Sequence, residues 1–255
     1  MLYGVCAPVS FAAEAKALGF DYLEASVTEL GQMTAEEFAR AEAAVRETGL
    51  PVPRCNCLFP SSITLTGGDS AADRTDRWLQ HALPRAKALG AELVVFGSGA
   101  SRRRPASVPY AAAFRRLART ARQIGTACAA LGMRVAIEPL NPGETNMILT
   151  LAEGAALAAA ADHPCVGLLA DAYHIALGGE PADDLKRLDT VWHVHVALRE
   201  GRRWPVREDP WLRDFLRCLT DTGYDGCVSI EGSSGDRRAD ATAALPLLRA
   251  WTAKE

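Results

Sequence analysis

Four ionisable side chains each come at the end of an apolar stretch in the second half of the chain. Glu138 ends VAIE, Asp171 ends GLLAD, His195 ends VWHVH and Glu231 ends VSIE. If three carboxylates and an imidazole met in one partly buried place, they would repel one another strongly unless they were paired. A divalent cation removes that repulsion, and mixed oxygen and nitrogen ligands suit Mn²⁺, Co²⁺ or Mg²⁺ better than a structural zinc site. We therefore predict one divalent metal bound by these four residues.

Strand geometry decides whether these side chains can point to a common place. Successive side chains of a strand alternate between its two faces. In VSIE, Val228 and Ile230 share one face, so Ser229 and Glu231 share the other. The same alternation separates the acidic end of GLLAD and the last histidine of VWHVH from their bulky neighbours. All the candidates are therefore compatible with one polar interior.

The elements that carry them follow a repeating order, in which a helix ends in glycine and an apolar strand follows at once. Glycine just after a helix adopts the left-handed conformation that stops it. These junctions are Gly19, Gly49, Gly90, Gly132 and Gly223. The long last interval has room for two further units, with strands VGLLADAY and VWHVHVAL, and LYGVC supplies an opening strand. Helical patterns lie between, such as TAEEFARAEAAVRE, where Thr34 and Glu37 predict a capping box.

Eight alternating strand and helix units predict the α/β class. The expected fold is a single (β/α)8 TIM barrel with a parallel, eight-stranded sheet, forming one domain over residues 1–255. The competing architecture, an open doubly wound sheet, usually has a glycine-rich phosphate loop after its first strand, whereas GVCAPVS follows here. Active-site groups of barrels lie at the carboxyl ends of the strands, which is where the four candidates come.

The bulk composition favours a small-molecule partner. The 255 residues carry a net charge of -3 and have a pI of about 6.0, so no whole-molecule positive field would gather nucleic acid or an acidic membrane. Without a secretory pattern or a long apolar stretch, we expect a cytoplasmic protein. The 7 cysteines include no CxxC pair, so we expect buried reduced thiols, with Cys55 and Cys57 alternating on one strand. Arg102, Arg103 and Arg104 predict a solvated loop, or alternatively a lid or anion contact.

The motifs IEPLN, GET, LADAYH, HVH and SIEG, in this order, resemble the xylose isomerase-like barrel superfamily, particularly its ketose 3-epimerases and hydroxypyruvate isomerases. The resemblance covers nearly the whole chain and is most specific from Glu138 to Glu231. It implies that Glu138, Asp171, His195 and Glu231 bind the metal, with Mn²⁺ as the expected ion. It further implies that Glu138 and Glu231 are the catalytic acid and base.

The resemblance also implies substrate contacts from Glu144, His174 and either Arg202 or Arg203. The expected partner is a small-molecule sugar, with no nucleic acid and no membrane, and a homodimer or homotetramer stays open. Departures from the family pattern surround the site: Pro142 follows the asparagine of IEPLN, the acidic residue common after HVH is missing, and Val206 replaces a glycine. The choice of sugar therefore does not follow from the resemblance.

The predicted chemistry is proton transfer next to a carbonyl. The enediolate that forms is stabilised by a cation, and one glutamate on each face removes and returns the proton, which gives an isomerase or epimerase of a ketose or small hydroxy-ketone. A metal-dependent dehydratase of a polyol ketone is the nearest alternative. An endonuclease-type barrel with several zinc ions is disfavoured by the 5 histidines and the acidic chain. A metal-binding barrel without catalysis is a further alternative.

Three other residues, Glu24, His193 and Trp204, have two readings each, and Trp192 has one. Glu24 ends the second expected strand and is either a structural acid or a substrate contact. His193 points inward and is either a hydrogen-bonded core histidine or a group that supports the metal or substrate. Trp192 should pack against helices. Trp204, beside the two arginines, either covers the sugar or fills a loop.

Overall fold

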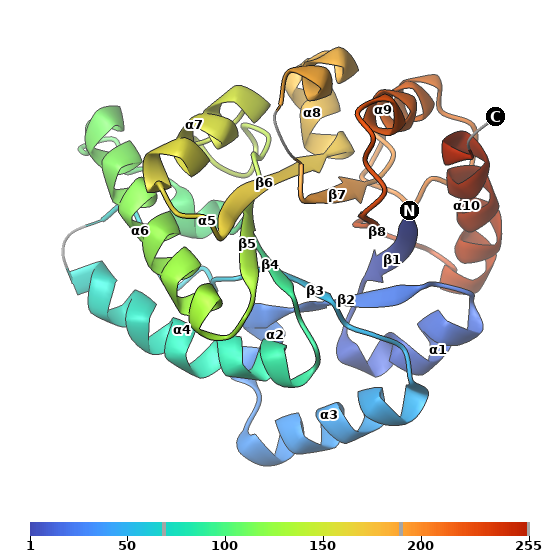
Figure 1. Cartoon of the computed structure of the whole chain (residues 1–255), viewed down its shortest axis with the longest axis horizontal. Helices are drawn as coiled ribbons and strands as arrows, with labels where there is room; N and C mark the ends of the chain where they lie inside the picture. The colour runs from blue at the N-terminus through green and yellow to red at the C-terminus, as the bar shows by residue number, and fades with distance from the viewer. Residues whose placement is uncertain (68–69, 189–190, 254–255) are drawn as a thin grey trace.

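The strands form one closed parallel barrel in which each strand pairs with the next along the chain and β8 pairs with β1 (Figure 1). The computed structural model describes residues 1–67, 70–188 and 191–253. The strands are β1 (Leu2–Cys6), β2 (Tyr22–Ser26), β3 (Arg54–Asn56), β4 (Leu93–Phe96), β5 (Arg134–Ile137), β6 (Val166–Asp171), β7 (His193–Val196) and β8 (Cys227–Ile230). The predicted eight-stranded (β/α)8 barrel is confirmed.

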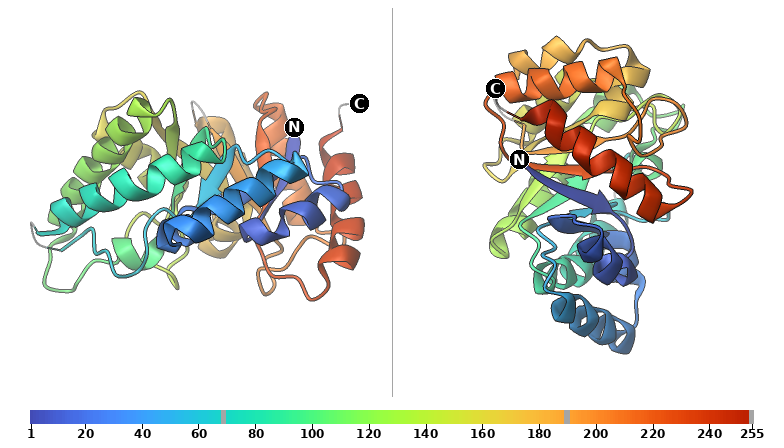
Figure 2. Two further views of the ribbon diagram at one scale, coloured as in Figure 1. Left: turned by 90° about the horizontal axis from the view of Figure 1, so that it is seen from below. Right: turned by 90° about the vertical axis from the view of Figure 1, so that its right-hand side faces the viewer.

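Helices surround the barrel, as the views of Figures 1 and 2 show. The α-helices are α1 (Ala12–Ala17), α2 (Val27–Gln32), α3 (Ala35–Thr48), α4 (Ser70–Ala88), α5 (Gly99–Arg102), α6 (Tyr110–Ala130), α7 (Leu151–Ala161), α8 (Ala172–Gly178), α9 (Pro210–Asp221) and α10 (Arg237–Thr252). Two 3₁₀ helices, η1 (Val9–Phe11) and η2 (Ala182–Arg187), follow β1 and α8. None of the helices among the described residues is both long enough and apolar enough to cross a membrane.

Local sequence chemistry explains where these elements begin and end. All five predicted junction glycines have positive φ angles, from 64° at Gly49 and Gly132 to 101° at Gly90, which L-residues rarely adopt. Helix α3 begins with the predicted capping box, in which Thr34 and Glu37 exchange side-chain to backbone hydrogen bonds.

Apolar side chains fill two layers. The larger cluster lies between the strands and the helices, and it contains the outward faces of strands such as Val228 and Ile230. A small cluster of Leu93, Val95, Ala136 and Leu169 fills the barrel interior. Trp192 packs against this inner cluster, so the prediction that it packs against helices was wrong. Trp192 precedes β7, and strand alternation therefore does not set its direction.

The strand register places the polar candidates at one end of the barrel. Asp171 pairs with His195, and His195 pairs with Ser229. Glu138 and Glu231 directly follow the last residues of β5 and β8. Because the strands are parallel, all these positions lie at the carboxyl end of the barrel.

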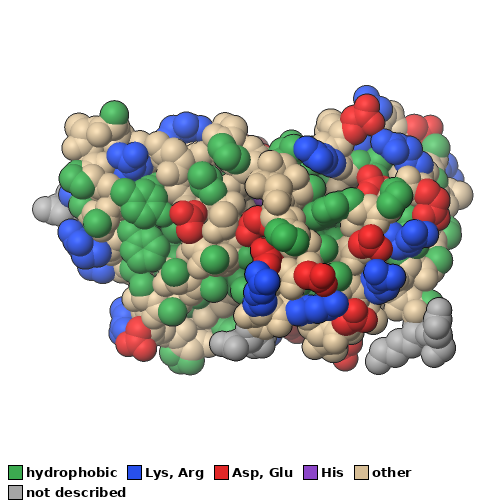
Figure 3. Space-filling view, turned by 90° about the horizontal axis from the view of Figure 1, so that it is seen from above, with side chains coloured by type: hydrophobic (Ala, Val, Ile, Leu, Met, Phe, Trp, Pro, Cys, Tyr) green, Lys and Arg blue, Asp and Glu red, His purple; other side chains and the backbone are tan. Residues whose placement is uncertain are grey.

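Acidic and basic side chains are intermixed on the face shown in Figure 3, as the small net charge suggests. The cysteines are free thiols, but the prediction that they are buried was wrong for Cys57, which is exposed, and Cys6 and Cys165 are half-buried. Cys57 lies beyond the end of β3 with φ 49°, so it does not alternate with Cys55 on that strand.

Candidate metal centre

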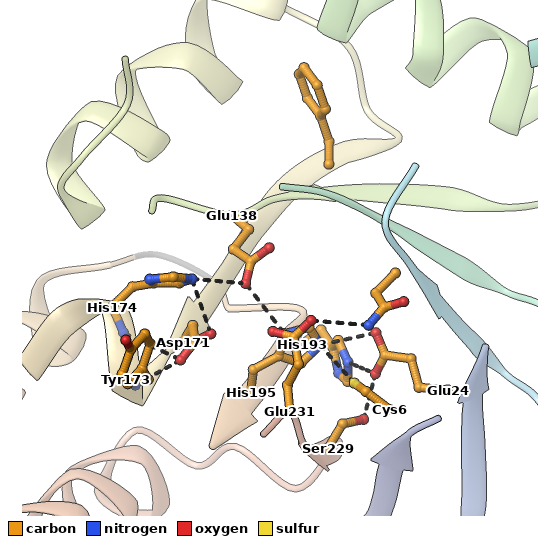
Figure 4. A network of polar contacts seen from close by, with 12 residues as sticks. Cys6, Glu24, Glu138, Asp171, Tyr173, His174, His193, His195, Ser229 and Glu231 are labelled. Atoms are coloured by element: carbon orange, nitrogen blue, oxygen red, sulfur yellow. Dashed lines mark hydrogen bonds and ion pairs between the residues drawn. The ribbon is translucent and has the colours of Figure 1, made fainter. Parts of the chain in front are cut away.

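The structure brings Glu138, Asp171, His195 and Glu231 together at the carboxyl end of the barrel (Figure 4). One ligand atom from each lies within 4.8 Å of those of the other three. His195 is fully buried, and the side chain of Glu231 keeps 18% of its surface exposed. Three carboxylates and one imidazole nitrogen at this spacing fit a single divalent cation that prefers oxygen donors.

His195 presents one ring nitrogen to this cluster and the other to a buried acid. Its Nδ1 lies 3.0 Å from Oε2 of Glu231 and 3.3 Å from Oε1 of Glu138. Its Nε2 lies 3.0 Å from Oε1 of Glu24. A carboxylate on Nε2 holds the proton there, which leaves Nδ1 as the nitrogen for a metal.

Glu24 is the centre of a fully buried network beneath the cluster. Its Oε2 lies 2.7 Å from Nε2 of His193 and accepts a 2.5 Å hydrogen bond from Ser229. The other ring nitrogen of His193 lies 3.1 Å from the carbonyl oxygen of Cys227. Glu24 is thus a structural acid, and His193 is a core histidine that supports it.

The surroundings shift the pKa values of the two glutamates of the cluster in opposite directions. Burial, together with the charge of Glu231, raises the pKa of Glu138. Burial would also raise the pKa of Glu231, but its close contacts with His195 and Arg202 outweigh burial and lower that pKa to about 2. The mutual repulsion of the carboxylates is what a bound divalent cation would relieve.

Of the two candidate arginines, the structure brings only Arg202 to the cluster. Its Nη2 lies 2.6 Å from Oε2 of Glu231 and 3.3 Å from Oδ2 of Asp171, and its Nη1 lies 3.1 Å from Oε1 of Glu144. Arg202 has φ 49° in a tight turn, and backbone strain of this kind concentrates at functional sites. The side chain of Arg203 is exposed and its backbone pairs with flanking segments, so the structure does not bring it to the cluster.

His174 reaches the cluster from α8. Its Nε2 lies 3.5 Å from Oδ2 of Asp171 and 3.9 Å from Oε1 of Glu138. The backbone N–H of Asn141 donates to its Nδ1, so a neutral ring carries its proton on Nε2, facing the carboxylates. The side-chain amide of Asn141 also donates to Glu144, which ties the two expected substrate contacts together.

Arg102 is buried, so the solvated-loop prediction was wrong for this member of the run. Its Nη2 donates to the carbonyl oxygen of Glu138 at 2.8 Å, and its guanidinium lies 5.5 Å from the ring centre of Phe96. Burial lowers its pKa to about 10. Arg103 is exposed and Arg104 is half-buried. Helix α5 turns Arg102 inward, which the run of three like charges does not indicate.

Residues that the sequence did not single out also border the cluster. The amide of Asn56, at the end of β3, donates to Oε1 of Glu231 at 3.0 Å. Cys6, at the end of β1, lies 3.9 Å from Nε2 of His195. Both come at strand ends, which is the feature that could have identified them.

Trp204 is buried and its indole N–H donates to the carbonyl of Gly232, so of its two readings the structure favours the one in which it fills a loop.

Residues 12–251 match the family described as the xylose isomerase-like TIM barrel. A stretch of 103 residues, 39% of the chain, is 29% identical to a probable ketose 3-epimerase of Synechocystis sp.. That match spans 35% of the length of this curated relative.

Solved structures resemble the whole chain. A D-psicose 3-epimerase from Clostridium cellulolyticum, solved with D-tagatose, has a TM-score of 0.84 at 18% identity, and 99% of each chain is covered. A 3-keto-D-glucoside 4-epimerase from E. coli has a TM-score of 0.81 at 20% identity, with 98% of this chain and 99% of that chain covered. At these identities the likeness concerns the fold. From the family match over nearly its whole length, the chain belongs to the xylose isomerase-like TIM barrels.

Proposed function

We propose that this protein is a divalent-metal-dependent isomerase or epimerase of a ketose or small hydroxy-ketone. The observation that carries the proposal is the placement of two glutamates around one imidazole nitrogen. Glu138 and Glu231 each lie within 3.3 Å of Nδ1 of His195, with Asp171 in the same cluster. The family and the epimerase names of the similar proteins support the same reaction class.

The proposed reaction moves one proton next to a carbonyl. One glutamate takes the proton from carbon, and the electron pair passes into an enediolate. The other glutamate returns a proton to the opposite face and inverts the carbon, or a proton returns to the neighbouring carbon and moves the carbonyl. A divalent cation held by Glu138, Asp171, His195 and Glu231, with Mn²⁺ as our expectation, would stabilise the negative charge on the substrate oxygens.

The surrounding polar groups would orient the sugar. Arg202 donates to Glu144, and Asn141 donates to both Glu144 and Nδ1 of His174, so these polar groups lie together beside the cluster. Their donors and acceptors match the hydroxyl and carbonyl oxygens of a sugar. Holding the carbon between the two carboxyl groups brings both within reach of the proton.

Hydrogen exchange in heavy water tests this function directly. Protein, Mn²⁺ and a panel of ketoses are incubated, and deuterium next to the carbonyl is followed by NMR. We expect exchange with formation of an epimer or aldose, and its abolition by a chelator. Loss of water from the sugar would instead identify a dehydratase. Unchanged sugars across the panel, with Mn²⁺ binding verified by calorimetry, would contradict the proposal.

A further inference from the structure

A hollow that is open to solvent lies beside Glu231. Its volume is about 460 Å³. A hexose fills roughly 180 Å³, about the share of six waters in the liquid. The space exists because the strand ends here carry small side chains: Cys6, Ala7, Pro8, Ser26, Gly232 and Ser233.

A second hollow continues from the first across α2. It has a volume of about 610 Å³ and shares Ser26 and Glu29 with the first hollow. Thr28, Gln32 and Glu37 also line it. Because they share Ser26 and Glu29, the two hollows form one shallow, solvent-open groove that runs from Glu231 to the outer surface of α2 and the start of α3. We call this the α2 cleft.

The charges of the α2 cleft select against an anionic sugar. Among its described lining residues Arg202 is the one cation, and it is already paired with Asp171, Glu144 and Glu231. Glu29 and Glu37 add negative charge along the outer part. A phosphorylated substrate would meet like charges there, which disfavours its binding. Hydroxyl, amide and carboxylate groups are well suited to bind a neutral polyol.

We propose that the preferred substrate is a ketose that carries a neutral glycosyl group on the carbon farthest from its carbonyl. This inference rests on the proposed function, because the carbonyl must be free for the proton to leave the neighbouring carbon. The reacting end lies between Glu138 and Glu231, and the second sugar unit lies in the α2 cleft. During turnover one C–H bond breaks and one forms, and the glycosidic bond stays intact.

Two probe sugars test the inference. Fructose and 6-O-glucosyl-fructose are each incubated with the full chain and Mn²⁺ in heavy water. We expect kcat/KM for deuterium exchange to be at least about tenfold higher for the glucosylated ketose, equal to about 1.4 kcal/mol of extra binding. Calorimetry should show a lower Kd for the glucosylated ketose than for fructose.

A substitution in the outer cleft locates the effect. Gln32→Trp fills the second hollow from an exposed position of α2, and we expect it to lower the ratio of the two kcat/KM values about tenfold. Ala43→Trp, exposed on α3 and absent from the cleft lining, leaves the charge unchanged like Gln32→Trp; it is the matched control and should keep the ratio.

The outcomes separate this inference from the proposed function. Exchange of fructose at an equal or higher rate than the glucosylated ketose would overturn the inference and leave the proposed function standing. A preference for fructose 6-phosphate in the same assay would overturn the charge argument and the inference with it. If no ketose exchanges, both fall.

Discussion

Glu138 and Glu231 occupy equivalent strand-end positions, yet the residues that surround them differ. Glu138 lies in a closed wall, where Arg102 bonds its backbone carbonyl and Gly97 leaves room for its carboxylate. Glu231 borders an open cleft and is held by polar partners, Asn56 and Arg202. Close packing therefore restricts the carboxylate of Glu138, whereas direct hydrogen bonds from Asn56 and Arg202 hold that of Glu231.

This difference bears on which proton each glutamate handles. Burial and the neighbouring carboxylate raise the pKa of Glu138, whereas His195 and Arg202 overcome burial to lower the pKa of Glu231. Paired acids whose environments push their pKa values apart are typical of acid and base partners. We therefore expect the two to be unequal in catalysis, and the predictions below test that inequality.

Removing either carboxylate should have the largest effect. Glu138→Gln and Glu231→Gln keep the side-chain size but abolish the general base, so we expect kcat to fall by about 10²- to 10⁴-fold in each. Deuterium exchange is measured at saturating Mn²⁺ in two assays, each of which starts from one of the two epimers. If each glutamate serves one face, the two variants should show opposite preferences between epimers. Rates near wild type in either variant would contradict the assignment.

Disturbing the closed wall should be nearly as damaging. A Cβ at Gly97 would come within 2.1 Å of Oε2 of Glu138, so Gly97→Ala must displace that carboxylate. We expect kcat to fall about 100-fold, the cost of a misplacement of about 1 Å. Gly67→Ala is the matched control, because its Cβ would make only an ordinary 3.6 Å contact with Thr64. Full activity in Gly97→Ala would argue against the closed wall.

Glu24 contacts His195, and His195 contacts both Glu138 and Glu231, so the loss of Glu24 should affect both glutamates alike. Glu24→Gln removes the negative charge that holds the proton on Nε2 of His195. We expect Mn²⁺ affinity, measured by calorimetry, to fall about 10- to 100-fold, with equal effects on both epimers. Glu92→Gln removes an exposed carboxylate that pairs with Arg54, and it should leave the affinity unchanged. Unaltered affinity in Glu24→Gln would refute this supporting role.

The barrel and the convergence of the four site residues follow from local patterns. Helix-ending glycines marked five of the units, and strand alternation put the inward polar side chains on one face. These features depend on neighbours in the chain, so a single sequence reveals them. The resemblance supplied the roles of Glu138 and Glu231, which remain predictions.

The rest of the site depends on contacts between distant segments. Glu24 meets His195 across the barrel, and no local pattern records that pairing. Arg102 is buried because α5 turns it inward beneath the end of β5. The choice of Arg202 over Arg203 is made by one left-handed residue in a turn, which adjacent arginines do not disclose.

The smallest effect should come from a change beside Glu231, which borders the open cleft. Asn56→Ala removes one hydrogen bond to Glu231, but Arg202 still holds that carboxylate. The loss of about 1 kcal/mol corresponds to a fall in kcat/KM of about fivefold. Because the bond reaches only Glu231, the fall should be larger for the epimer whose proton Glu231 handles. Equal losses for both epimers would show that Glu138 and Glu231 do not serve different faces of the substrate. The structural difference between their surroundings would then have no catalytic meaning.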